Sequence, residues 1–292
     1  MRNVLMTGAT GQIGSVVLSR LGEIATSKDL VYFLEHNRGI DTSTLEGDYA
    51  TQRIKDIRVN REYDVALHFA ANIHTKYCDK LEHQGEFIRD NVILTERVCN
   101  QSKRVIMIST DNVFNGMDGQ DYKENDKIDP CNFYGVTKAE AEKIVLDHGG
   151  AVIRIQTMTG VDHNLIIDRV LEGIDGKDYW PFWADQYVRP TFFEDFLSVV
   201  KKVYDSEAKG VYHVSCGGQA LSRAEIAQRV LDVFKAEGIE MKRTTLEYGV
   251  CDNPKFPRRL VLDTVKTKQD LGINFTHVDE AIKQHVLRLR KN

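Results

Sequence analysis

Two side chains that could move a proton, Tyr134 and Lys138, lie four residues apart near the middle of this chain. The segment continues as Ala139-Glu140-Ala141-Glu142-Lys143, which strongly favours a helix, so the phenol and the ammonium share one helical face. A free phenol has a pKa of about 10, and a cation within about 4–6 Å lowers it. We therefore expect Tyr134 to exchange a proton with a substrate oxygen, with Lys138 lowering the pKa of its hydroxyl.

Two hydroxyl side chains, Ser109 and Thr110, follow the uninterrupted apolar run Val105-Ile106-Met107-Ile108. Such a run is typical of a strand that is buried on both faces. Open α/β sheets bind their ligands at the carboxyl ends of such strands. We therefore expect these two hydroxyls to lie at a ligand site.

The chain begins with a strand, a turn and a helix that could hold a dinucleotide. Asn3 to Thr7 predicts a short buried strand, Gly8-Ala9-Thr10-Gly11-Gln12-Ile13-Gly14 follows at once, and Ser15 to Leu21 predicts a helix. In that context Gly8 permits a tight turn, Gly11 lets the backbone approach a pyrophosphate, and Gly14 allows close helix packing. A helix N-terminus offers amide donors to phosphates. The residues expected to bind the phosphates are Gly8, Thr10, Gly11, Gln12 and Ile13.

The residues after the second predicted strand, Leu30 to Leu34, bear on the choice of cofactor. A carboxylate there would bind the ribose 2′-hydroxyl of NAD, whereas an arginine would bind the 2′-phosphate of NADP. Both types are present, because Glu35, Asn37 and Arg38 follow the strand. We favour NADP, since a guanidinium can bind a phosphate through two hydrogen bonds, and NAD stays open as the alternative.

The glycine loop, Ser109 to Gly116 and Tyr134-x-x-x-Lys138 together resemble the extended short-chain dehydrogenase/reductases, and most closely the dTDP-4-dehydrorhamnose reductases. Asn112 departs from the pattern, because that family usually has tyrosine there. The resemblance covers nearly the whole chain and implies an α/β fold with a doubly wound parallel sheet. It implies a dinucleotide-binding domain over residues 1–160 and a mainly substrate-binding portion over residues 161–292, with residues 191–216 returning to the first.

The resemblance also assigns residues to the two binding sites. Gly47-Asp48-Tyr49 corresponds to a segment beside the adenine, and His68-Phe69-Ala70-Ala71 to one along the cofactor. Beyond the glycine loop, the expected cofactor residues are Glu35, Asn37, Arg38, Asp48, Tyr49, Phe69, Ala70, Ala71, Ser109, Tyr134 and Lys138. The expected substrate residues are Asn72, His74, Thr110, Asp111, Asn112, Gln186, Arg189 and, as a clamp on the nucleotide diphosphate, Arg258 or, alternatively, Arg259.

Other segments predict the elements between these motifs. Helices are expected over Thr51 to Asn60, Asp79 to Gln101, Asn164 to Gly173 and Val278 to Leu289, and a capping box, Ser222-x-x-Glu225, should open another. Strands are expected over Asp64 to Phe69 and Ala151 to Ile155. Asn91 matches an asparagine that in the reductases helps to organise the catalytic helix and strand. We expect His68 to be a packed residue at a strand end and not a catalytic one.

The length, composition and net charge of the chain are those of an ordinary globular enzyme. The chain has 292 residues, 42% hydrophobic and 28% charged, and its net charge of −4 argues against a nucleic-acid partner. No apolar run approaches a membrane span, and no signal-peptide pattern precedes the first strand. The five cysteines form no C-x-x-C pair, which favours the reducing cytoplasm and argues against a metal site. We expect a cytoplasmic monomer or homodimer.

The resemblance implies reduction of a 4-keto-6-deoxy sugar attached to a nucleotide. Hydride would pass from the nicotinamide to the ketone carbon while Tyr134 protonates the alkoxide. Lys138 would hold the nicotinamide ribose, and Thr110 would hydrogen-bond the ketone oxygen and Tyr134. One alternative is a dehydratase or epimerase on the same fold, which Asn112 disfavours because dehydratases of this family need an acid directly after Thr-Asp. The other is a non-catalytic NADP-binding subunit, since one relative of these reductases regulates methionine adenosyltransferase.

Overall fold

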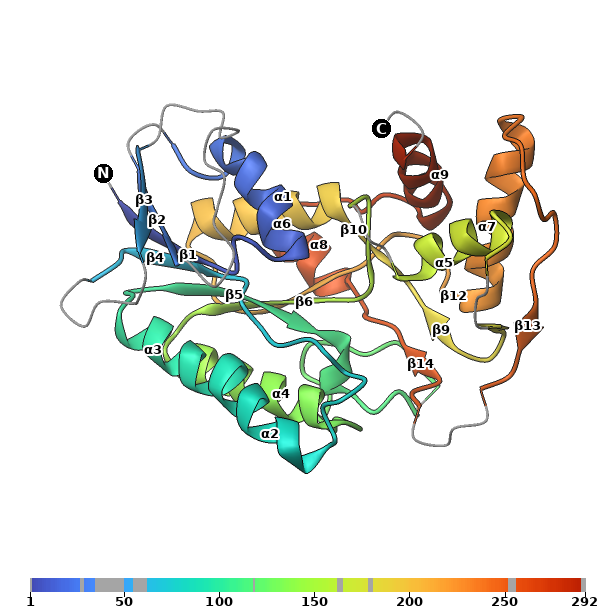
Figure 1. The fold of residues 1–292 in the computed structure, drawn as a ribbon. Coiled ribbons are helices and arrows are strands. Elements are labelled where there is room, and N and C mark those ends of the chain that lie inside the picture. Colours follow the sequence, from blue (N-terminus) through green and yellow to red (C-terminus); the bar gives the residue numbers. More distant parts are fainter. Residues whose placement is uncertain are drawn as a thin grey trace. The chain divides into compact units, whose positions relative to one another are not determined.

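The computed structural model describes residues 2–26, 29–34, 50–54, 62–117, 119–161, 165–177, 181–251 and 256–289, with only the backbone for 50–54 (Figure 1). The chain forms two compact units. The first contains Met1–Val113, Ile128–Arg154 and Leu197–Tyr212, and the second Phe114–Lys127, Ile155–Phe196 and His213–Asn292. The assignment of cofactor and substrate binding to separate portions of the chain stays a prediction.

A parallel sheet forms the centre of the first unit. In the described residues it has seven strands in the order β11-β6-β5-β4-β1-β2-β3, and β1 pairs in parallel with both β2 and β4. The strand order reverses at β1, which is where doubly wound sheets bind their ligands. The predicted fold class is confirmed. The strands are β1 (Asn3–Thr7), β2 (Leu30–Leu34), β3 (Ala50–Ile54), β4 (Val65–His68), β5 (Val105–Thr110), β6 (Ala151–Ile155) and β11 (Gly210–Val214).

Helices cover both faces of this sheet. Figure 1 shows α1 (Gln12–Ser19) and α6 (Phe193–Ser206) on one face, and α2 (Leu81–Phe87), α3 (Leu94–Asn100) and α4 (Phe133–Asp147) on the other. A π-helical segment, Ile88–Ile93, joins α2 to α3, so the long helix predicted over Asp79 to Gln101 is interrupted by a bulge. Short 3-10 turns are formed by Leu21–Glu23 and Asp111–Val113. Apolar side chains of the sheet and of α3 and α4 form a shared core, which includes Leu5, Ala66, Val98, Val105 and Val145.

The helix predicted over Thr51 to Asn60 is wrong in its first half. Ala50–Ile54 forms β3, which pairs in parallel with β2 from Leu30↔Ala50 to Leu34↔Ile54. This pairing joins segments that are distant in sequence, and such contacts override local helix propensity. Residues 55–60 lie outside the part of the chain that the structure describes.

Within the described residues, the second unit combines helices with three small sheets. Its helices are α5 (Leu165–Ile174), α7 (Arg223–Ala236), α8 (Val265–Leu271) and α9 (Val278–Leu289). The bounds of α9 are those predicted for the last helix. The predicted capping box of Ser222 and Glu225 is confirmed at the start of α7. The sheets contain β7 (Met158–Thr159) with β10 (Thr191–Phe192), β8 (Phe182–Trp183) with β13 (Tyr248–Gly249), and β9 (Tyr187–Val188) between β12 (Leu221–Ser222) and β14 (Arg259–Leu260).

Candidate active site

The glycine loop between β1 and α1 has almost no room for side chains. Gly8 has φ +72°, and a Cβ atom there would lie 2.5 Å from the backbone nitrogen of Ala70. A Cβ atom on Gly14 would overlap the carbonyl oxygen of Gly8, so both positions need glycine. Gly11 precedes α1 and provides no side-chain cap, so the N-terminus of the helix directly follows the loop. The loop therefore has the tight backbone that a pyrophosphate site requires.

The phenol of Tyr134 meets the hydroxyl of Thr110 at the carboxyl end of β5. Asn132 caps α4 by accepting a hydrogen bond from the Gly135 amide at 2.8 Å, which places Tyr134 in the first turn of that helix. A Cβ atom on Gly135 would overlap the carbonyl oxygen of Asn112, so glycine lets α4 approach the end of β5 closely. The side chains of Tyr134 and Thr110 are both buried, and the Thr110 hydroxyl is close enough to act on the pKa of the phenol. The structure therefore brings the two hydroxyls to the same strand end, and the hydrogen bond expected between them stays a prediction.

The expectation that Lys138 lowers the pKa of Tyr134 is wrong. Burial raises the pKa of the Tyr134 hydroxyl well above its usual value, the carboxylates of Asp111 and Glu142 raise it further, and the nearby Thr110 hydroxyl opposes them. The spacing of four residues could not reveal this result, because it carries no information about burial. At neutral pH this phenol keeps its proton, so it is suited to donate a proton.

Lys138 lies one helical turn after Tyr134 and is buried, with 3% of its surface exposed. Its Nζ donates a hydrogen bond to the carbonyl oxygen of Ile108 at 2.7 Å, which uses one of the three donors of an ammonium. Burial lowers its pKa to about 8, and the charge of Glu142 opposes this shift. Lys138 therefore anchors α4 to the end of β5.

A buried ion pair joins the same helix, α4, to strand β6. Glu142 accepts hydrogen bonds from Nε of Arg154 at 3.0 Å and from Nη2 at 2.7 Å, and each side chain is 3% exposed. Sequence reasoning missed both residues and also Gly135. Glu142 could have been found, because it follows Lys138 by one helical turn and therefore lies on the same face. Its partner on β6 could not, because no sequence spacing indicates a contact between a helix and a strand.

Several other predicted residues surround this centre. Asn112 donates to Thr110 Oγ1 at 3.2 Å and to Asp111 Oδ1 at 2.9 Å. The Ser109 hydroxyl is buried and has no hydrogen-bond partner within the described residues. Phe69, Ala70, Ala71 and Asn72 follow β4, and the Asn72 backbone nitrogen donates to Asn91 Oδ1 at 2.7 Å. His74 is exposed on the same loop.

Five predicted cofactor residues lie outside the described part of the chain. They are Glu35, Asn37, Arg38, Asp48 and Tyr49. The choice between NADP and NAD depended on Glu35 and Arg38, so it stays a prediction from the sequence.

The remaining substrate candidates, Gln186, Arg189 and Arg258, belong to the second unit. Gln186 Nε2 donates to the carbonyl oxygen of Pro257 at 3.1 Å, and Arg258 forms an ion pair with Asp185. Arg189 donates to Ser215 Oγ at 3.1 Å and also to the backbone oxygens of Gly218 and Leu262. Through these contacts Arg189 holds together parts of that unit at Ser215, Gly218 and Leu262.

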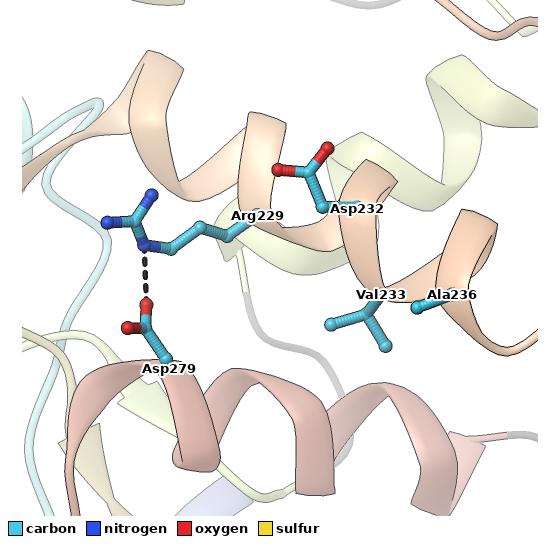
Figure 2. Close-up of a pocket in the computed structure, with 5 residues that line it drawn as sticks. All are labelled: Arg229, Asp232, Val233, Ala236 and Asp279. Atoms are coloured by element: carbon cyan, nitrogen blue, oxygen red, sulfur yellow. Dashed lines mark hydrogen bonds and ion pairs between the residues drawn. The ribbon is translucent and has the colours of Figure 1, made fainter.

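Figure 2 shows a surface pocket of about 320 Å³ between α7 and α9 of the second unit. Arg229 and Asp279 form an ion pair across it, and Asp232, Val233 and Ala236 complete its lining. None of the predicted site residues is among them. The pocket therefore offers no set of groups for the chemistry expected from Tyr134.

The described ranges contain no group of three His, Cys, Asp or Glu side chains that could hold a metal ion. No helix that the structure describes has both the length and the apolarity needed to cross a bilayer. The five cysteines are free thiols, four of them buried and Cys131 partly exposed.

Comparison with known proteins covers nearly the whole chain. The family model described as RmlD substrate binding domain matches residues 1–291. The spore coat polysaccharide biosynthesis protein SpsK of Bacillus subtilis (strain 168) is 27% identical over 297 residues, which are 98% of this chain and 97% of that protein. Methionine adenosyltransferase 2 subunit beta of Xenopus tropicalis is 27% identical over 277 residues, which are 88% of this chain and 80% of that protein.

A solved structure with the same fold is that of dTDP-4-dehydrorhamnose reductase from Bacillus anthracis str. Ames in complex with NADP. It is 19% identical, its TM-score is 0.76, and the match covers 98% of each chain. At that identity the likeness shows the fold alone.

Proposed function

Because the chain belongs to the RmlD substrate binding domain family, we propose that it is an NAD(P)-dependent oxidoreductase that reduces a nucleotide-activated 4-keto-6-deoxy sugar. One observation carries the proposal. The buried Tyr134 hydroxyl lies beside the Thr110 hydroxyl at the carboxyl end of β5, one helical turn from the buried ammonium of Lys138. An acid, a second hydroxyl and a fixed cation are the groups that carbonyl reduction requires.

Three residues of the chain have different roles in this reduction. Tyr134 donates its proton to the carbonyl oxygen, because its raised pKa keeps the phenol protonated at neutral pH. Thr110 would orient the same oxygen by turning its hydroxyl hydrogen toward it from Asp111 Oδ1, to which it donates at 3.0 Å. Lys138 supplies a positive charge beside the reacting groups, and burial of all three side chains excludes water and strengthens these interactions.

A reduced nicotinamide dinucleotide would supply the hydride. Its pyrophosphate would lie against the glycine loop at Gly8, Thr10, Gly11, Gln12 and Ile13, where added Cβ atoms at Gly8 and Gly14 have no space. The residues that would hold the rest of it are Phe69, Ala70, Ala71, Ser109 and Lys138, with Glu35, Asn37, Arg38, Asp48 and Tyr49 on the adenosine side. The buried Ser109 hydroxyl, which has no partner within the described residues, supports this fit. We favour NADP because of Arg38, with NAD as the alternative.

The residues proposed to bind the substrate are those expected from the sequence. Asn72, His74, Thr110, Asp111 and Asn112 belong to the first unit, and Gln186, Arg189 and Arg258 to the second. Gln186 Oε1 is buried and has no hydrogen-bond partner in the described residues, which favours a ligand contact there. The cytoplasmic location and the monomeric or homodimeric state stay predictions of the sequence.

Similarity to methionine adenosyltransferase 2 subunit beta supports a second candidate, a regulatory subunit that binds the cofactor without turnover. A complete set of Thr110, Tyr134 and Lys138 favours catalysis over that candidate. The other alternative predicted from the sequence, a dehydratase or epimerase, stays disfavoured, because Asn112 cannot act as the acid that follows Thr-Asp in dehydratases.

The test is a turnover assay with a panel of nucleotide-4-keto sugars, in which oxidation of NADPH or NADH is followed by absorbance. Oxidation with one of these sugars, and a matching loss of the ketone, is the expected result. Cofactor binding without oxidation for every sugar would favour the regulatory subunit. Loss of water from a nucleotide sugar without net cofactor consumption would identify a dehydratase.

A further inference from the structure

His68, which sequence reasoning set aside as a packed strand-end residue, is hydrogen-bonded through both of its ring nitrogens. It ends β4 in the first unit and is 1% exposed. Its Nδ1 lies 2.7 Å from Thr7 Oγ1, at the end of β1. Its Nε2 lies 2.9 Å from Thr95 Oγ1, on α3. The imidazole therefore bridges two elements that lie on different sides of its own strand end.

The neighbouring hydrogen bonds determine which nitrogen carries the proton. The Thr95 hydroxyl donates its one hydrogen to the carbonyl oxygen of Asn91 at 2.6 Å, so it can only accept from His68. His68 must then carry its hydrogen on Nε2, and Nδ1 must accept from the Thr7 hydroxyl. Thr7 Oγ1 in turn accepts from the Ala70 backbone amide at 3.2 Å. Each group in this series of hydrogen bonds therefore donates to the next one, from the Ala70 amide through Thr7, His68 and Thr95 to the carbonyl oxygen of Asn91.

A neutral imidazole is needed for this arrangement, and the surroundings favour it. Complete burial, helped by the positive charge of Lys138, lowers the pKa of His68 to about 3. His68 therefore stays neutral across the pH range in which the protein would work.

One end of this chain of hydrogen bonds lies at the glycine loop. Thr7 directly precedes Gly8, and the Ala70 amide is the group that a Cβ atom on Gly8 would meet at 2.5 Å. Holding the Thr7 hydroxyl and the Ala70 amide together therefore holds the loop against the end of β4.

The other end lies at the catalytic helix. Asn91 belongs to the π segment Ile88–Ile93, and its side chain donates to Thr137 Oγ1 at 3.0 Å. Thr137 donates to the carbonyl oxygen of Tyr134 at 2.9 Å. Asn91 also holds the Asn72 backbone, accepting from its nitrogen at 2.7 Å and donating to its oxygen at 3.1 Å. The position of Asn91 therefore affects the first turn of α4 and the loop after β4.

We propose that His68 is a positioning residue that couples the glycine loop to the catalytic helix through Thr7, Thr95 and Asn91. The coupling rests on the proposed function, because it gives His68 a role in cofactor binding. A histidine that only fills the core would also be buried and hydrogen-bonded, but changes to its partners would then alter stability and leave cofactor affinity unchanged. Thr95 separates the two cases, since it lies at the far end of the relay from the glycine loop.

The test compares Thr95→Val, which removes the hydroxyl at nearly constant shape, with Thr95→Ser, which keeps it. NADPH affinity is measured by quenching of protein fluorescence, and the thermal midpoint is recorded for each variant. We expect Thr95→Val to weaken NADPH binding about tenfold, because it leaves the His68 Nε2–H without a buried acceptor. Thr95→Ser should restore affinity to within about twofold of wild type, because the hydroxyl is restored. An unchanged affinity in a folded Thr95→Val protein would overturn the coupling.

Two further measurements test the hydrogen bonds of His68 directly, and neither depends on turnover. Nitrogen-15 NMR of the histidines in the full chain should show His68 neutral, with its proton on Nε2, and the opposite tautomer or a charged ring would overturn the relay. His68→Asn, which keeps an acceptor near Thr7 but loses the donor to Thr95, should weaken NADPH binding as Thr95→Val does. A wild type that binds neither NADPH nor NADH would overturn the proposed function. A wild type that binds NADPH, together with variants that bind it equally well, would overturn the coupling alone.

Discussion

At the residue scale, the proton of Tyr134 is the group on which turnover should depend. Tyr134→Phe removes the hydroxyl and keeps the ring, so we expect turnover to fall by about 10²–10⁴. Cofactor affinity should stay within about twofold, because the proposed phosphate contacts lie in the glycine loop. Steady-state turnover and NADPH binding by fluorescence measure the two effects. A variant that keeps turnover within about tenfold of wild type would exclude Tyr134 as the acid.

The second prediction at this scale concerns the charge of Lys138. Its pKa in the folded chain is lowered to about 8 from 10.5, so cofactor affinity should fall as pH rises through about 8 and the ammonium is lost. Lys138→Met should bind NADPH more weakly at every pH and should show no midpoint near 8. Titration of the NADPH dissociation constant from pH 6 to pH 10 measures both. A midpoint that persists in Lys138→Met would assign the titration to another group.

The same shift has a consequence for stability. Because the pKa of Lys138 is lower in the folded chain, that chain binds fewer protons than the unfolded chain between about pH 8 and 10.5. The contribution of Lys138 to the free energy of unfolding therefore rises with pH across this window, and below it the buried charge opposes folding.

At the scale of elements, the approach of α4 to β5 depends on Gly135. Gly135→Ala would place a methyl group on the Asn112 carbonyl, so we expect the free energy of unfolding to fall by about 1–3 kcal/mol and turnover to fall as Tyr134 moves away from Thr110. Urea unfolding and turnover are the measurements. Gly85→Ala is the matched control, because Gly85 lies in α2 with open space around it. That change should stabilise the chain by about 0.5–1 kcal/mol.

The buried pair of Glu142 and Arg154 joins α4 to β6 and gives the second prediction at this scale. Glu142→Gln leaves the buried guanidinium without its counter-charge, so we expect a loss of about 3–5 kcal/mol in the free energy of unfolding. Glu140→Gln is the control, because Glu140 lies on the same helix and is exposed. Its effect should stay within about 0.5 kcal/mol. Equal denaturant midpoints for the two variants would show that the pair adds nothing to the packing of α4.

At the scale of the whole molecule, cofactor binding should stabilise the folded chain. NADPH at 100 times its dissociation constant should raise the free energy of unfolding by about 2.7 kcal/mol. At equal concentrations NADPH should stabilise at least as strongly as NADH, if Arg38 contacts the 2′-phosphate. Arg38→Ala should then weaken NADPH about tenfold or more and leave NADH nearly unchanged, since a charge-assisted hydrogen bond contributes about 1.5–3 kcal/mol. Equal losses for both cofactors would exclude that contact.

Features that depend on neighbours in sequence were predicted well. The bounds of β1, β2, β6 and α9 match the predictions, because each forms from a short run with one clear periodicity. The glycine loop, the capping box at Ser222 and the pairing of Tyr134 with Lys138 on one helical face also depend on short spacings. The family itself was predicted from such motifs and is confirmed.

Features that depend on distant contacts needed the folded chain. β3 forms because β2 offers it a backbone to pair with, and nothing in residues 51–54 indicates that partner. The pKa of Tyr134 rises because the hydroxyl is buried and lies near the carboxylates of Asp111 and Glu142, and the proton of His68 is fixed by hydroxyl groups on two other elements. Burial and long-range hydrogen bonds are set by the packing of the whole unit, so no local pattern contains them.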